Sequence, residues 1–133
     1  MTDQNIPKVF ISYSWSTASD LSIELAKRLM RNGVDVVIDK WNLLEGQNKY
    51  EFMQKSVNDE TIDKVILLCD KSYSEKANEF KDGVGQETMI ISPQIYKDVL
   101  QTKFLPIVIE KDDQNNPYLP SYLKPLIYID LSP

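Results

Sequence analysis

The sequence has no histidine, and this absence removes several kinds of catalytic site. Neither a Ser-His-Asp triad nor a Cys-His pair can form without an imidazole base. A zinc site is disfavoured too, because histidine and cysteine are the usual zinc ligands and Cys69 is the only cysteine. An enzyme built from this chain would therefore use carboxylates, hydroxyls, lysine or backbone dipoles, and we expect no metal.

Cysteine, arginine and long apolar stretches are also scarce. A lone Cys69 cannot form an internal disulfide, which is typical of a reducing compartment such as the cytoplasm. Arg28 and Arg31 are the only arginines and the net charge is −5, which argues against a nucleic-acid partner. Apolar runs such as 65–69 are too short to span a membrane, and the polar residues 1–5 lack the pattern of a signal peptide.

What the chain does contain is the pattern of one α/β domain over residues 1–133. Its composition, 42% hydrophobic and 26% charged, is ordinary for a globular protein of this length. The unbroken apolar run Val9–Ile11 is typical of a strand buried on both faces, and it turns polar at Ser12. Apolar residues at helical spacing follow over 21–30, and Asn32-Gly33 ends that helix.

Later segments continue to alternate between the two patterns. A polar segment at 71–81 and a glycine turn at 82–85 precede the third helix, and Pro106 suggests an edge strand or a bulge. The resulting order predicts a flavodoxin-like three-layer α/β fold with a five-stranded parallel sheet in the order 2-1-3-4-5. We predict the further strands at 34–38, 62–69, 104–109 and 126–129, and the further helices at about 48–59 and from Gln86.

Ligands of such sheets bind beyond the carboxyl ends of the strands, at the switch point between the first and third strands. Loops 12–15 and 69–72 should flank this pocket, and the helix that starts at Gln86 should close it. Glu87 lies in the first turn of that helix. Its carboxylate either complements the positive helix N-terminus or faces the pocket.

Two further sets of residues allow two interpretations each. Ser14, Ser16 and Thr17 could contact a ligand, but capping of the first helix is favoured, because Thr17 to Asp20 resembles a capping box. The large apolar residues of loop 41–46 could cover the core or form an exposed adhesive loop. The first strand is followed by Ser12-Tyr13, so the chain has no glycine-rich phosphate loop and no acidic pair of a receiver domain there.

An ordered set of short stretches resembles the TIR domain family. The stretches 9–15 (Val-Phe-Ile-Ser-Tyr-Ser-Trp), 35–41 (Asp-Val-Val-Ile-Asp-Lys-Trp) and Leu44-x-Gly46 carry this resemblance. Three more are similar to the SEFIR-like bacterial branch of that family, namely 76–78 (Lys-Ala-Asn), 83–87 (Gly-Val-Gly-x-Glu) and 104–107 (Phe-Leu-Pro-Ile).

The resemblance implies an activity, a substrate and a site. Many bacterial and plant TIR domains cleave NAD+ to nicotinamide and ADP-ribose or a cyclic variant. By resemblance, Glu87 is the catalytic glutamate, and NAD+ is a substrate with no separate cofactor. Many of these enzymes carry a tryptophan where this chain has Gly83, and segment 73–87 is longer in this chain than in those enzymes. Both departures from the family pattern concern the wall of the pocket. The implied substrate-binding residues are Tyr13, Ser14, Trp15, Asp39, Trp41, Leu44, Gly46, Ser72, Tyr73 and Gly83.

The resemblance also implies partners. Loop 41–46 is similar to the family's BB loop, which gates the pocket and joins neighbouring TIR domains. TIR enzymes generally work when clustered, so we expect the isolated domain to have little activity. We expect it to be a piece of a longer protein with a sensor, such as a cyclic-dinucleotide receptor of the STING type, in antiphage signalling. The alternative is a non-catalytic adaptor that works through TIR–TIR contacts.

Overall fold

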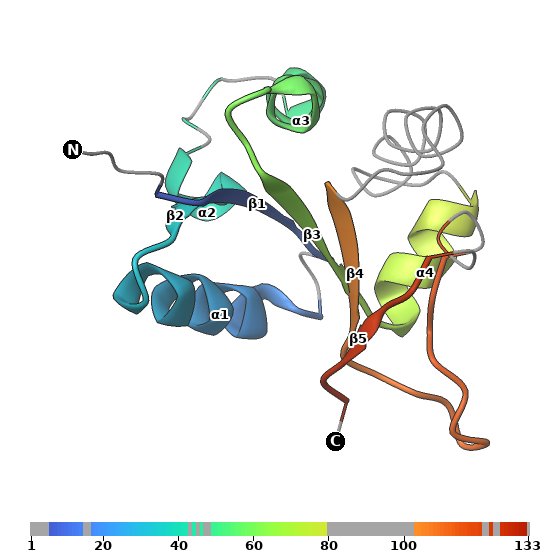
Figure 1. The fold of residues 1–133 in the computed structure, drawn as a ribbon. Helices are drawn as coiled ribbons and strands as arrows, with labels where there is room; N and C mark the ends of the chain where they lie inside the picture. Colours follow the sequence, from blue (N-terminus) through green and yellow to red (C-terminus); the bar gives the residue numbers. More distant parts are fainter. Residues whose placement is uncertain are drawn as a thin grey trace.

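The structure is a computed structural model that describes residues 6–14, 17–42, 44, 46, 49–79, 103–120, 123 and 126–132. Figure 1 shows how strands and helices alternate along these ranges. None of the helices described is both long and apolar enough to cross a membrane. In chain order the elements are β1 (Lys8–Ser12), α1 (Ser19–Arg31), β2 (Asp35–Val37), α2 (Asp39–Asn42), α3 (Lys49–Asn58), β3 (Lys64–Cys69), α4 (Lys71–Glu79), β4 (Phe104–Val108) and β5 (Ile129–Asp130).

The strands of the described ranges form one five-stranded parallel sheet in the order β2-β1-β3-β4-β5. In the centre of the sheet, Phe10 of β1 pairs with Val37 of β2 on one side and with Val65 of β3 on the other. The predicted fold class and strand order are therefore confirmed. This order places the switch point between the carboxyl ends of β1 and β3.

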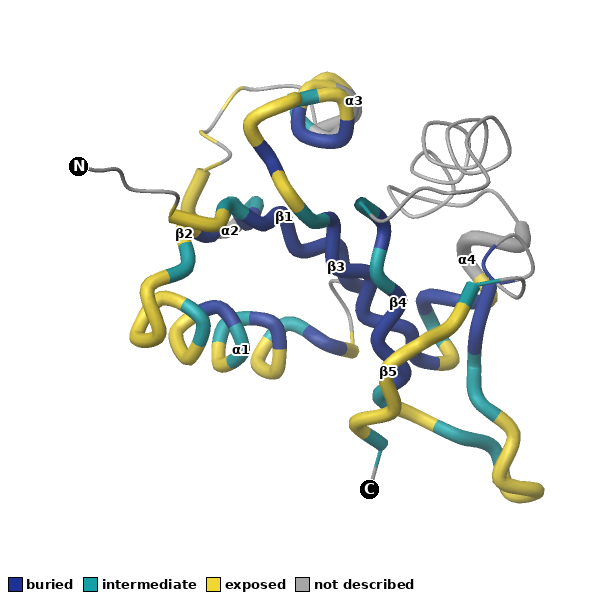
Figure 2. Tube along the Cα trace, in the orientation of Figure 1, coloured by how far each residue is buried: buried dark blue, intermediate teal, exposed yellow. Residues whose placement is uncertain are grey.

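Alternate residues of the central strands face opposite layers of the fold. Ile11 of β1 packs in one core cluster with Ala26 of α1, whereas Phe10 packs in the other with Val57 of α3. Figure 1 shows α1 and α3 on opposite sides of the sheet, and Figure 2 shows β1 and β3 as buried strands between them. Both faces of β3 are covered, which explains the unbroken apolar run at 65–69.

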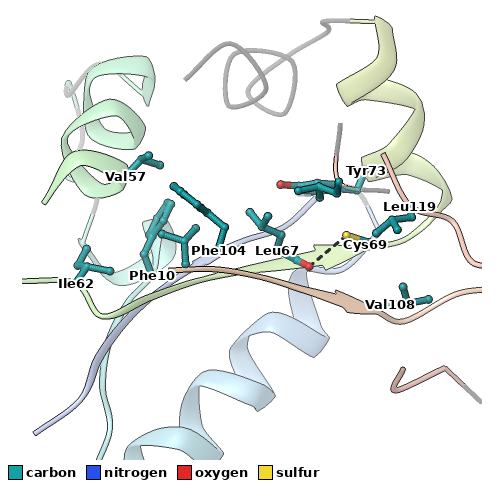
Figure 3. Close-up of a cluster of buried hydrophobic side chains, with 11 residues drawn as sticks. Phe10, Val57, Ile62, Leu67, Cys69, Tyr73, Phe104, Val108 and Leu119 are labelled. Carbon is teal, nitrogen blue, oxygen red and sulfur yellow. Dashed lines mark hydrogen bonds between the residues drawn. The ribbon is translucent and has the colours of Figure 1, made fainter. Parts of the chain in front are cut away.

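The cluster on the α3 side is drawn in Figure 3. The rings of Phe10 and Phe52 meet edge to face, with centroids 6.1 Å apart and planes at 72°. Leu67 and Val65 of β3 are fully buried beneath this layer. Burial of each such aliphatic side chain stabilises the fold by about 1.5–3 kcal/mol, so this cluster fixes α3 on the sheet.

The polar segment predicted at 71–81 is a helix rather than a loop over its first nine residues, which form α4. Asp70 starts this helix, because its Oδ1 accepts a hydrogen bond of 2.8 Å from the Tyr73 N–H. The side chain of Tyr73 is fully buried and anchors the first turn in the core. The nine residues of α4 contain one large apolar side chain, so the sequence lacks the apolar periodicity that predicts a helix.

The predicted capping box at α1 is also wrong. The helix begins at Ser19, its N-cap residue is Ala18, and no side chain caps it. The Thr17 hydroxyl instead donates to Asp70 Oδ2 at 2.7 Å, from one βα loop to the next. A long-range partner has therefore displaced the local one that the pattern indicated.

Smaller corrections concern the strands and the loop after β2. Helix α2 takes the first residues of the predicted 41–46 loop, and β5 lies at Ile129–Asp130 rather than 126–129. Pro106 is not in an edge strand, because β4 lies between β3 and β5. The Lys103 carbonyl and the Ile109 N–H both form hydrogen bonds to β3. Because the hydrogen-bonding direction alternates along a strand, the backbone nitrogen of Pro106 faces β5, and pairing with β5 starts only at Ile107.

Candidate functional site

Side-chain hydrogen bonds between described residues join the two loops at the switch point. We call this set the switch-point seam. It links the β1–α1 connection to the start of α4. Its members are Ser12 Oγ with Tyr73 Oη at 2.9 Å, Ser14 Oγ with Ser72 Oγ at 2.9 Å, and Thr17 Oγ1 with Asp70 Oδ2 at 2.7 Å.

Burial explains why these hydroxyls bond to one another. Ser12, Ser14 and Tyr73 are all nearly inaccessible to solvent, and a buried polar group without a partner costs about 1–3 kcal/mol. Ser12 pairs with β3 through strand pairing and with Tyr73 through its side chain. The seam therefore keeps the two loops next to each other, just as β1 and β3 are neighbours in the sheet. The predicted neighbourhood of loops 12–15 and 69–72 is confirmed for their described residues.

Carboxylates of the protein occupy the N-terminus of α4. Asp70 Oδ1 accepts from the Tyr73 N–H, and Glu110 Oε1 accepts a bond of 3.0 Å from the Lys71 N–H. An anionic ligand at this helix end would meet these two acids rather than free N–H groups. A phosphate of a bound nucleotide is therefore disfavoured at the start of α4.

Asp70 is a site residue that the sequence reasoning missed. Its side chain is almost fully buried and holds both Thr17 and Tyr73. The signal was present, because an acid between a strand and a helical segment is a common N-cap. Periodicity alone predicts no helix after Asp70, so the pattern does not indicate a cap there.

Tyr13 connects the seam to the segment after β2. Its hydroxyl donates to Asp39 Oδ1 at 2.7 Å, and its side chain packs in the α1-side core. Burial, and after it the hydrogen bond to Asp39, raises the pKa of Tyr13 well above its usual value. The phenol is therefore neutral at physiological pH, and its one proton is directed at Asp39.

Loop 41–46 exposes apolar side chains. Trp41 is 42% exposed and Leu44 is 67% exposed, which favours the adhesive interpretation of the loop over the core-covering one. Gly46 has φ of 85°, a conformation that side-chain-bearing residues rarely adopt. The loop therefore turns at Gly46 and presents Trp41 and Leu44 to solvent.

A groove of about 590 Å³ lies beside this loop, against α3. Its apolar part comes from β2, from the inner face of α3 and from the residues before β3, and its rim is polar. Of the predicted substrate-binding residues, Gly46 lines it. The lining residues are Val37, Asn42, Gly46, Glu51, Phe52, Lys55, Ser56, Asp59 and Ile62.

The predicted site residues thus fall into three sets. Ser14, Ser72 and Tyr73 belong to the seam, and Tyr13 adjoins it and reaches Asp39. The second set, Trp41, Leu44 and Gly46, lies in the exposed loop. The third set, Trp15, Gly83 and Glu87, lies outside the described residues, as does the helix predicted from Gln86.

Comparisons with known proteins agree with this fold. The family model described as TIR domain matches residues 9–133. The crystal structure of a prokaryotic SEFIR domain is 44% identical, with a TM-score of 0.70, and the match covers 89% of this chain and 77% of that one. A comparison with curated proteins gives no match.

More distant structures share the fold alone. The TIR domain of the Toll-related receptor TRR-2 from Hydra magnipapillata is 17% identical, with a TM-score of 0.65 and coverage of 92% of this chain and 82% of that one. A metazoan TIR-STING receptor from C. gigas is 15% identical, with a TM-score of 0.67 and coverage of 91% and 36%. The family match over 9–133 and the 44% identity together show that the chain belongs to the TIR domain family, in its SEFIR-like branch.

Proposed function

We propose that this domain is an NAD+ glycohydrolase that cleaves the bond between nicotinamide and ribose. The TIR family includes NAD+-cleaving members and non-catalytic adaptors, so membership alone leaves both open. The observation that carries the proposal is the switch-point seam, in which Ser14 and Ser72 hold the β1 and β3 loops together. A nucleotide site at the switch point needs these two loops side by side.

The chemistry suits a chain without histidine. Cleavage passes through an oxocarbenium-like state on the ribose, as in glycoside hydrolysis. Nicotinamide leaves a cation as a neutral molecule, so no general acid has to protonate it. In this proposal the Glu87 carboxylate holds the ribose hydroxyls and stabilises the positive charge that develops, and each 1.4 kcal/mol of such stabilisation gives about tenfold in rate.

In this proposal the described residues at the switch point would orient the substrate rather than supply charge to it. Of the seam's hydroxyl groups, those of Thr17 and Ser72 are accessible and already held in place, while Asp70 is committed to Thr17 and to the Tyr73 N–H. Hydroxyls fixed in advance lose little freedom when a sugar or amide binds. The pyrophosphate would lie away from the start of α4, because Asp70 and Glu110 occupy its N–H groups.

We further propose that activity depends on clustering of TIR domains in the cytoplasm. The exposed Trp41 and Leu44 provide apolar surface for a second copy of the domain. A fused sensor, such as a cyclic-dinucleotide receptor, would bring the copies together in antiphage signalling. This arrangement keeps NAD+ intact until the sensor responds.

The experiment is nicotinamide release measured by chromatography with the domain dilute and with the domain clustered on a multivalent scaffold. We expect release from the clustered sample, little from the dilute one, and ADP-ribose or its cyclic form as the second product. Full activity at high dilution would contradict the dependence on clustering. No release in any assembled state would contradict the glycohydrolase.

The second candidate function is a non-catalytic adaptor that signals by TIR–TIR contacts. The exposure of Trp41 and Leu44 favours it independently of the pocket. An adaptor would lose self-association when Trp41 is replaced by Ala, and it would release no nicotinamide before or after that change. Association of the parent domain without turnover therefore identifies the adaptor.

A further inference from the structure

The segment that carries Trp41 and Leu44 begins with a compact turn. The N–H groups of Trp41 and Asn42 both donate to the Ile38 carbonyl at 3.0 Å. The Asn42 side-chain oxygen accepts in return from the Ile38 N–H at 2.9 Å. Because the Ile38 side chain is fully buried, this turn behaves as one small body attached to the end of β2.

A hydrogen bond between distant parts of the chain ties that body to β1. It runs from the Tyr13 hydroxyl to Asp39, the first residue of α2, over 2.7 Å. A bond of this length to a carboxylate is among the stronger hydrogen bonds in proteins. The bond therefore sets the position of the turn relative to the end of β1.

The other end of this bond is unusually well held. The Tyr13 side chain is 4% exposed and belongs to the core cluster with Ile11 and Ile38. Its neighbours in sequence, Ser12 and Ser14, are both members of the switch-point seam. The hydroxyl that meets Asp39 is thus carried by a buried side chain between two hydrogen-bonded neighbours.

We propose that Tyr13 is a positioning residue, which fixes residues 39–42 against the switch-point seam through its bond to Asp39. Trp41 is then presented in one arrangement, and a second copy of the domain meets a side chain that is already positioned. The role differs from direct substrate contact, because the single phenolic proton is donated to Asp39. It does not depend on whether the domain cleaves NAD+.

The test uses Trp41 as its own reporter. The chain has two tryptophans, so Trp15→Phe leaves Trp41 as the only source of indole fluorescence. In this background, Tyr13→Phe removes the hydroxyl and keeps the ring. Loss of a hydrogen bond worth about 1.4 kcal/mol shifts the ratio of displaced to positioned segment about tenfold. We therefore expect stronger quenching of Trp41 by acrylamide and lower fluorescence anisotropy in the folded protein.

The matched control is Tyr73→Phe, which also removes one buried hydroxyl, but one that bonds to Ser12 rather than to Asp39. It should leave the Trp41 signal unchanged. Equal effects of the two changes, or no effect of Tyr13→Phe, would overturn the proposal. Far-UV circular dichroism checks that each variant is folded.

Changes at Asp39 test the same bond from its acceptor. Asp39→Asn keeps an oxygen that can accept from Tyr13 and should keep the parent signal, whereas Asp39→Ala should raise the quenching of Trp41 at least as much as Tyr13→Phe. Adding Tyr13→Phe to Asp39→Ala should change nothing further. Additive effects of these two substitutions would show that the residues act separately and would overturn the proposal. Where Tyr13→Phe fails to fold, Asp39→Ala carries the test with Asp39→Asn as its control, and an unchanged Trp41 signal in Asp39→Ala overturns the proposal.

Discussion

At the scale of single residues, burial decides what Cys69 can do. Its side chain is fully buried at the end of β3, and its thiol donates to the Leu67 carbonyl at 3.3 Å, as Figure 3 shows. Burial, with the neighbouring Asp70 as a smaller cause, raises the pKa of the thiol well above its usual value. Cys69 is therefore an apolar core residue and not a nucleophile.

This predicts that the native protein does not react with Ellman's reagent at pH 8, where an exposed thiol reacts within minutes. In guanidinium chloride the same sample should release one equivalent of thionitrobenzoate per chain, since Cys69 is the only cysteine. The reaction is followed by absorbance. Rapid labelling of the folded protein would contradict the buried position of the thiol.

At the scale of elements, α4 depends on one carboxylate. Asp70 caps the helix through the Tyr73 N–H and ties it to the β1–α1 loop through Thr17. Asp70→Ala should lower the free energy of unfolding by about 1–3 kcal/mol, because it removes the cap and leaves the Thr17 hydroxyl unpaired. Urea denaturation measures this loss.

Thr17→Val separates the two roles of Asp70, because it removes the tie between loops and leaves the cap in place. Its effect should be smaller than that of Asp70→Ala, and Asp70→Asn should lie between the parent and Asp70→Ala. If Thr17→Val destabilises the protein as much as Asp70→Ala, the cap of α4 contributes nothing.

Strand β5 has an electrostatic anchor at the edge of the sheet. Asp130 forms an ion pair with Lys111 at 2.5 Å and also accepts from Ser132. Hydrogen bonds from Lys111, and then from Ser132, lower the pKa of Asp130 from 3.8 to about 2. Because the folded state has the lower pKa, this stabilisation is complete above about pH 4 and is lost as the pH falls through about 2.

An NMR titration of the Asp130 carboxyl carbon should therefore have its midpoint near 2. Lys111→Met should move that midpoint up toward the ordinary value of 3.8, and added salt should act in the same direction. Lys27→Met in α1 is the control and should leave it in place. If the titration midpoint of Asp130 is unchanged in Lys111→Met, the ion pair does not form in solution.

Prediction from the sequence succeeded where one pattern sufficed. The runs at 9–11 and 65–69 identified buried strands, because a parallel sheet covers both their faces. Prediction failed where a distant partner decided the outcome. Thr17 matches a helix cap in sequence, but in the structure its hydroxyl donates a hydrogen bond to Asp70. Asp70 likewise turns a polar segment into α4 through a bond that no periodicity records.

At the scale of the whole molecule, the strand order is what made part of the site predictable. Once β1 and β3 are neighbours, the residues after both strands must meet, and Ser14 and Ser72 do so. The tie between Tyr13 and Asp39 was not predictable, because it depends on how β2 ends and on the short helix α2. The roles assigned to Trp15, Gly83 and Glu87 stay predictions, since these residues lie outside the described ranges.

Apolar surface is exposed at both edges of the sheet. Trp41 and Leu44 follow β2 at one edge, while Ile127, Ile129 and Leu131 lie along or beside β5 at the other. Neighbouring exposed apolar side chains, unlike single ones, are typical of surfaces that contact other chains. Among the described residues, both edges of the sheet therefore offer apolar surface to a second chain.

The central claim concerns the Glu87 carboxylate, and nicotinamide release from clustered domains measures it most directly. Glu87→Gln keeps the size of the side chain and removes its charge, and Glu24→Gln does the same on the exposed face of α1. We predict that the clustered parent and Glu24→Gln release nicotinamide from NAD+ at the same rate, while Glu87→Gln loses at least about a hundredfold in rate. Undiminished release by Glu87→Gln would contradict the account.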